Sequence, residues 1–195
     1  MKKLILLLVL ASMVPAAHAD DVMDWVNDGI EAYKNKDFSE AITNFEYAAQ
    51  LIRQMKGEAL TDVMPDALPG WKKVESEGTG MGAAMFGGAT GANARYEKGD
   101  SWCEIDLTTD NPMLASISMM FSNPMMLTAS GQKLIKINGE KFAIDYDDGD
   151  RSGEITGAVA DKVLAQIRGG NISEDDLRAY AKGVDYDKIE EIAGE

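Results

Sequence analysis

Histidine and cysteine are almost absent from this chain, which contains one of each in 195 residues. The histidine, His18, lies in a segment that we expect to be removed. The mature chain would then have no imidazole for general-base catalysis, for a nucleophilic triad or for a nitrogen-ligated metal. We therefore expect a protein that is not an enzyme and that carries no cofactor.

The first 19 residues have the composition of an export signal. Lys2 and Lys3 supply a basic start, the apolar run Leu4–Leu10 follows, and Ala17-His18-Ala19 forms a small-x-small cleavage site before Asp20. The apolar run is too short to span a bilayer as a helix. We predict a signal peptide over residues 1–19 and no transmembrane anchor, with the mature protein in the periplasm or, alternatively, secreted.

Positive charge is also scarce, and the formal net charge is −14. Loss of the signal would remove two lysines and no acids, and would make the charge −16. Such a balance repels nucleic-acid phosphates and anionic lipid headgroups. The sequence therefore excludes nucleic acid as a partner and is compatible with cations or basic partners.

A single cysteine cannot form an internal disulfide. Cys103 lies within an alternating run, residues 102–107, in which a buried structural thiol is the simplest interpretation. An exposed redox thiol or an intermolecular bridge is the alternative. Stability must then come from an apolar core, which a 45% hydrophobic composition can supply.

The segment after the signal is typical of two helices joined by a short turn. The first is expected over residues 22–34, and the polar pair Lys36-Asp37 follows it. The second carries apolar residues at helical spacing to about residue 56. These apolar residues are Phe38, Ala41, Ile42, Phe45, Ala48, Ala49 and Ile52. We assign residues 20–60 to this helical hairpin.

The hairpin resembles a single tetratricopeptide repeat over residues 22–55. Trp25, Gly29, Ala41, Phe45 and Ala48 have the spacing of that family's 34-residue pattern. The resemblance implies that small residues let the two helices approach and that aromatic residues fill the gap. A lone repeat must bury its exposed face on something else. The candidates are the rest of this chain, a second subunit in a homo-oligomer, or a peptide.

The remainder, residues 66–195, is predicted to be an α+β domain built on an antiparallel meander, with one inserted helix and with C-terminal helices on one face. Alternating residues flank the turn pairs Gly99-Asp100 and Asn138-Gly139. Asn111 and Pro112 predict a helix start, and Ser173 predicts another. The expected strands are 71–77, 92–98, 101–108, 133–137, 141–146, 154–159 and 162–167. The expected helices are 111–121, 174–182 and 186–192.

This domain also resembles an uncharacterised family of bacterial exported proteins, over about residues 68–190. The residues that carry the likeness include Leu68-Pro69-Gly70-Trp71, Met85-Phe86-Gly87-Gly88 and Ala179-Tyr180-Ala181. The resemblance implies an exported compartment and the limits of a domain. It implies no particular chemistry.

Residues 78–92 form an uncharged segment with six glycines. One interpretation is a hairpin tip whose Met81, Met85 and Phe86 pack against the sheet. The alternative is a flap or patch that contacts an apolar ligand, a protein partner or a bilayer. The segment lacks the following helix of a dinucleotide-binding loop.

Methionines cluster near this segment, and seven lie between positions 81 and 126: Met81, Met85, Met113, Met119, Met120, Met125 and Met126. Methionine is an adaptable filler of apolar pockets and promiscuous surfaces. Thioethers are also soft ligands for Cu(I). Met81, Met85, Met125 and Met126 are the candidate copper ligands.

The acidic segment 145–150 invites comparison with a calcium loop. Its glycine, Gly149, is the fifth residue from Asp145 instead of the sixth, and the twelfth residue is Thr156, so the EF-hand pattern fails. A solvated Asp-Gly turn is the simpler interpretation. A weak divalent-cation site remains the alternative, and its candidate ligands are Asp145, Asp147, Asp148 and Asp150.

Together these features predict an exported, soluble, non-catalytic binding protein. We expect it to bind an apolar small molecule or a protein partner through adaptable apolar side chains. The predicted contact residues are Met81, Met85, Phe86, Met113, Met120, Met125 and Met126. Cu(I) handling by methionines and weak cation binding at the acidic turn are the alternatives.

Overall fold

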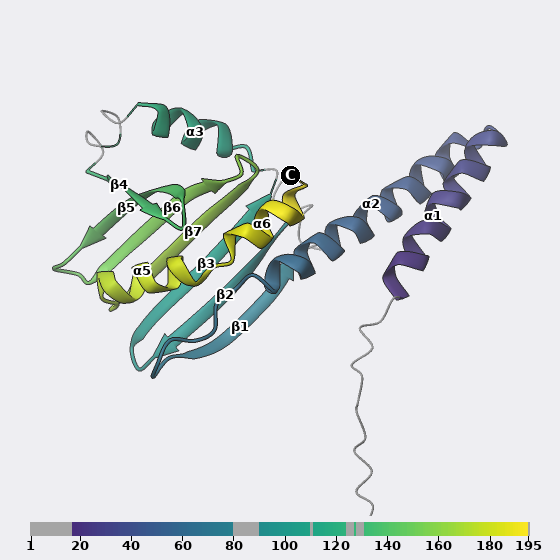
Figure 1. Ribbon diagram of the computed structural model, residues 1–195. Coiled ribbons are helices and arrows are strands. Elements are labelled where there is room, and N and C mark those ends of the chain that lie inside the picture. Colours follow the sequence, from purple (N-terminus) through teal and green to yellow (C-terminus); the bar gives the residue numbers. More distant parts are fainter. Residues whose placement is uncertain (1–16, 80–89, 110, 124–126, 128–130, 195) are drawn as a thin grey trace, which may run out of the picture. The chain divides into compact units, whose positions relative to one another are not determined.

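The computed structural model describes residues 17–79, 90–109, 111–123, 127 and 131–194. The chain forms two compact units, Met1–Leu51 and Ile52–Glu195. Figure 1 shows the elements of both. The boundary falls within helix α2 (Phe38–Thr61). The end of this helix belongs to the second unit because Leu60 is fully buried in that unit's core.

The first unit is the predicted helical hairpin. Helix α1 (Ala17–Lys34) and the first part of α2 are joined by three residues, in which Lys36 has a φ of 65°. Asp37 caps α2, because its Oδ1 accepts a hydrogen bond from the Glu40 amide at 3.1 Å. The early part of α1 faces the later part of α2: the rings of Trp25 and Tyr47 stack with centroids 4.8 Å apart.

Gly29 lets the two helices of the hairpin approach closely. A Cβ atom at this position would lie 2.7 Å from Cε1 of Phe45. Ala32, Ala41 and Ala48 are buried in the same unit. The expectation that small residues line the contact between the helices is therefore met in these positions.

The second unit is an α+β domain with a seven-stranded antiparallel sheet, as predicted. The strands are β1 (Lys72–Thr79), β2 (Thr90–Lys98), β3 (Ser101–Thr109), β4 (Lys133–Ile137), β5 (Glu140–Asp147), β6 (Ser152–Val159) and β7 (Val163–Gly170). Their order in the sheet is β1-β2-β3-β7-β6-β5-β4. The sheet therefore consists of two meanders, which meet where β3 pairs antiparallel with β7.

Tight turns set the register of the hairpins. Asn138 and Gly139 have φ values of 51° and 96° between β4 and β5, the geometry expected for an Asn-Gly turn. Gly99 has a φ of 61° between β2 and β3. Between β6 and β7, however, the left-handed positions are occupied by Ala160 and Asp161.

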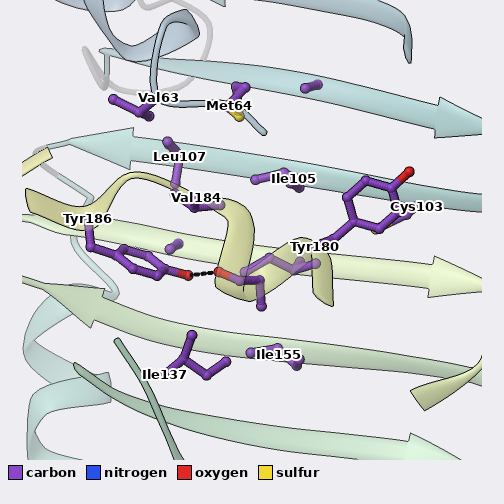
Figure 2. Close-up of a cluster of buried hydrophobic side chains, with 14 of the residues drawn as sticks. Val63, Met64, Cys103, Ile105, Leu107, Ile137, Ile155, Tyr180, Val184 and Tyr186 are labelled. Carbon is purple, nitrogen blue, oxygen red and sulfur yellow. Dashed lines mark hydrogen bonds between the residues drawn. The ribbon is translucent and has the colours of Figure 1, made fainter. Parts of the chain in front are cut away.

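Helices α5 (Glu174–Gly183) and α6 (Tyr186–Ala193) lie across one face of the sheet (Figure 1). Ser173 caps α5 as predicted, because its side chain accepts a hydrogen bond from the Asp176 amide at 3.1 Å. Figure 2 shows the apolar side chains between these helices and the strands, among them Cys103, Ile155 and Tyr180. The single cysteine is thus a buried thiol in this core, as its alternating sequence indicated.

Helix α3 (Leu114–Ser122) packs against the other face of the sheet. Its Ile117 packs with Ala158 and Leu164. Their sequence neighbours Val159 and Val163 belong to the core under α5 and α6, and successive side chains of a strand point to opposite faces. The helix starts later than predicted. The Asn111 side chain accepts a hydrogen bond from the Met113 amide at 2.9 Å, which makes a turn before the helix begins.

Candidate functional site

The predicted methionine site lies mostly outside the described residues. Met81, Met85, Phe86, Met125 and Met126 belong to that part of the chain. Of the others, Met113 is 52% exposed just before α3, and Met120 is half-buried on α3. They are seven positions apart, so they share one side of the helix. The copper-binding hypothesis stays a prediction.

The acidic turn is stabilised by its own carboxylate. Oδ1 of Asp147 accepts hydrogen bonds from the amides of Gly149 at 2.7 Å and Asp150 at 3.1 Å. This is the Asp-Gly turn that the sequence indicated. In the residues that the structure describes, no group of three or more His, Cys, Asp or Glu side chains is placed to hold a metal ion. Cation binding at this turn stays a prediction.

A row of charged residues crosses the second face of the sheet. Arg95 stands opposite Glu104, and Glu104 stands opposite Arg168. The full row, one residue from each of six strands, is Glu75, Arg95, Glu104, Arg168, Glu154 and Asp145. Cross-strand neighbours of opposite charge attract each other, so the middle of the row stabilises the sheet.

Arg168 interacts with acids of β3, whereas Arg95 interacts with Glu97 of its own strand, at 3.0 Å from Nε to Oε1, and more loosely with Glu104 of β3. Nη2 of Arg168 lies 2.6 Å from Oδ2 of Asp106 and 3.9 Å from Oε1 of Glu104. Nη1 of Arg95 lies 3.6 Å from Oε2 of Glu104, and its guanidinium lies 5.2 Å from the Trp102 ring centroid. Hydrogen bonding to Asp106 raises the pKa of Arg168. These contacts account for both arginines as structural residues.

A hollow of about 440 Å³ lies at one end of this face. Trp102, Arg168 and three acids, Asp145, Asp147 and Glu154, line it. Glu154 accepts hydrogen bonds from two neutral donors, Thr156 and Gln166. The hollow is acidic, but nothing in the described residues identifies a ligand for it.

The hairpin of the first unit presents a larger apolar surface. Seven large apolar side chains within residues 21–51 are exposed from 39% to 62%, and all of them except Tyr47, which stacks on Trp25, lie on one side of the hairpin. We call this the apolar side, and it consists of Met23, Ile30, Tyr33, Phe38, Ile42 and Phe45. The rings of Tyr33 and Phe38 are in contact, with centroids 5.9 Å apart. The apolar residues of α1 and those of α2 therefore form one continuous surface.

Helix geometry places both parts on the same side. In α1, Ile30 lies about 100° and Tyr33 about 40° around the helix from the buried Gly29, both in the direction of the helical rotation. In α2, Phe38 and Ile42 are displaced in the same sense from the buried Ala41 and Ala48. The two helices are antiparallel and face each other. Rotation in the same sense from the facing residues therefore places the exposed apolar residues of both helices on the same side of the hairpin.

The sequence interpretation missed this surface. The sequence interpretation placed aromatic residues in the gap between the helices, and the ring of Phe45 does lie against Gly29. Phe38 and Ile42, however, extend to the flank of the hairpin and are more than half exposed. Helical-wheel positions relative to Gly29 and Ala41 are the signal that could have identified it.

One Ser-x-x-Lys spacing, Ser130 and Lys133, also occurs in the sequence. This pairing supplies a nucleophile and a base in some acyl-transfer enzymes. Side chains three residues apart meet on a helix. Lys133, however, begins strand β4 and is exposed, and Ser130 lies outside the described residues. The spacing therefore gives no support for a catalytic pair.

Burial moves the titrating groups of the core away from neutral pH. Loss of solvent raises the pKa of the Cys103 thiol to about 12. It also raises the pKa values of the Tyr96, Tyr180 and Tyr186 hydroxyls above their usual range. These groups stay protonated at neutral pH, and act as core residues.

In comparisons with protein-family models, curated proteins and solved structures, none was found to match this chain. No helix in the described part of the chain has both the length and the apolar composition that a membrane crossing requires. The fold is an α+β domain preceded by a helical hairpin.

Proposed function

We propose that this chain is an exported, non-catalytic interaction protein that binds a protein partner through the apolar side of its N-terminal hairpin. The observation that carries the proposal is the exposure of Met23, Ile30, Tyr33, Phe38, Ile42 and Phe45 together on one side of two helices. Scattered apolar residues are common on protein surfaces, whereas a continuous apolar patch is typical of a binding surface.

The energetics favour a covered state of this surface. Full burial of one large apolar side chain contributes about 1.5–3 kcal/mol of transfer free energy. These side chains are about half exposed, so covering six of them contributes several kilocalories per mole before the cost of association. A protein surface is a better complement than a small molecule because the patch extends over two helices.

The Gly/Met-rich segment is a second proposed contact, for an apolar ligand or partner. Its residues are Met81, Met85, Phe86, Met113, Met120, Met125 and Met126. The exposure of Met113 and the partial exposure of Met120 support it. The export signal at residues 1–19 supports a periplasmic location, with secretion as the alternative.

Cysteine labelling in the exporting cell tests the main proposal. The native thiol is fully buried and has a pKa raised to about 12, so the parent protein should give little background. Ile42→Cys places a thiol on the apolar side. Asp28→Cys, about half a turn from the apolar residues of α1, is the matched control.

With reductant present, we expect a maleimide reagent to label position 28 quickly and position 42 slowly. Dilution of the purified protein should restore labelling at position 42, because a separate partner dissociates. Equal labelling of both positions in the cell would refute the proposal. Persistent protection of position 42 at high dilution would also refute it.

A further inference from the structure

We propose that the partner of the apolar side is a second copy of this chain, so that two hairpins associate into an antiparallel four-helix bundle. This inference rests on the proposed function and specifies its partner. The apolar side of one copy would contact the apolar side of the other, and a twofold axis would relate the two identical surfaces.

The shape of the surface favours another helical hairpin. The apolar side consists of two antiparallel stripes, Met23, Ile30 and Tyr33 on α1 and Phe38, Ile42 and Phe45 on α2. Pairs of antiparallel helices bury such stripes against one another in four-helix bundles. A second copy provides stripes of identical length and composition, so each apolar side chain of one copy can face one of the other.

The charge distribution permits self-association at this surface. Two chains of net charge −14 repel each other at most orientations. In α1, however, Asp24 and Asp28 lie about 120–180° around the helix from Ile30 and Tyr33. Contact between the apolar sides therefore directs these acids away from the twofold axis.

The available area is sufficient for a weak, specific dimer. A half-exposed side chain of this size offers about 100 Å². The six residues of the apolar side would bury about 1,200 Å² over two copies. That is the lower bound of standard specific interfaces, before smaller residues at the rim are counted. The dimer is therefore expected to dissociate on dilution.

Sedimentation equilibrium of the purified mature chain, residues 20–195, tests the inference. We expect twice the mass of one chain at high concentration and a shift toward one chain on dilution. Ile42→Glu should raise the dissociation constant by about tenfold or more, because a carboxylate would be buried at the interface. Thr43→Glu is the control, since it places the same charge about 100° around the helix.

Folding is controlled separately by circular dichroism, and Phe38→Gln provides a second, uncharged variant of the apolar side. A single-chain mass at all concentrations would overturn the inference, as would equal weakening by the variants at positions 42 and 43. If the purified chain is monomeric but position 42 is protected in the cell, a different protein is the partner, and only the self-association fails. If position 42 is also labelled freely in the cell, the proposed function fails with it.

Discussion

Arg168 and Asp106 form the shortest ion pair across the second face of the sheet among the described residues, with 2.6 Å between Nη2 and Oδ2. They belong to strands β7 and β3, the two strands that join the meanders. Arg168 stands directly opposite Glu104 and lies diagonally from Asp106. The ion pair therefore links β3 and β7, two neighbouring strands that are far apart in the sequence.

Replacement of Arg168 should weaken this junction slightly. Its side chain is 45% exposed, so solvent screens the interaction and Arg168→Met should lower the free energy of unfolding by about 0.5–1 kcal/mol. The loss should shrink in high salt. Urea denaturation at two ionic strengths measures both effects. Arg151→Met is the control, because Arg151 is exposed in a turn; equal losses for the two variants would contradict the prediction.

A methyl group at Gly157 should disturb the core. An alanine Cβ at this position would lie 2.5 Å from Cε1 of Phe142, a fully buried ring that packs against Tyr186. We expect Gly157→Ala to lower the free energy of unfolding by about 1–3 kcal/mol. In Gly149→Ala the nearest atom is the exposed Asp147 carboxylate at 3.1 Å, so chemical denaturation should show little change. A neutral Gly157→Ala would show that the ring can move aside.

The turn between β6 and β7 should gain stability from glycine. Ala160 has a φ of 50°, and the left-handed conformation costs about 1–2 kcal/mol for residues with a Cβ. Part of this gain is offset by the greater flexibility of glycine in the unfolded chain. We expect Ala160→Gly to raise the free energy of unfolding by about 0.5–1 kcal/mol. Ala115→Gly, at an exposed position of helix α3, should instead destabilise; the same sign for both variants would contradict this account.

The protein should lose stability at alkaline pH. Burial raises the pKa of Cys103 from 9.0 to about 12, and it raises the pKa values of Tyr96, Tyr180 and Tyr186 from 10.0. Well below pH 9 these four groups are protonated in both states, so they add no pH dependence to the stability. Above pH 9 the unfolded chain releases protons first, so its free energy falls relative to that of the folded chain.

Thermal unfolding followed by circular dichroism should therefore show a melting temperature that declines between pH 9 and pH 12. Reaction of Cys103 with a thiol reagent should begin only as the fold is lost. Rapid reaction at neutral pH in the folded state would contradict the buried environment of this thiol.

Much of the second unit could be predicted from local sequence. The Asn138-Gly139 pair marks a two-residue turn because both residues tolerate positive φ. The Ser173 side chain and the acids that follow it mark the start of α5. Each of these features depends on residues close together in the sequence, so it can be predicted without knowledge of the distant contacts.

The sheet order and the exposed surface of the hairpin depend on distant contacts. Nothing local to β3 or β7 specifies that they pair, and so the charged row through Glu104 and Arg168 was not predicted. In the hairpin, periodicity showed which residues are apolar but not which of them face the other helix. That depended on the close approach at Gly29, which leaves Ile42 on the flank.

Photo-cross-linking in the exporting cell tests the central claim most directly. A photoreactive amino acid in place of Ile42 should give one major product with the mass of two copies of this chain. The same group in place of Thr43, the neighbouring exposed residue, should give little product. The account would be contradicted if position 42 gave no protein adduct, or if both positions gave adducts with equal yield.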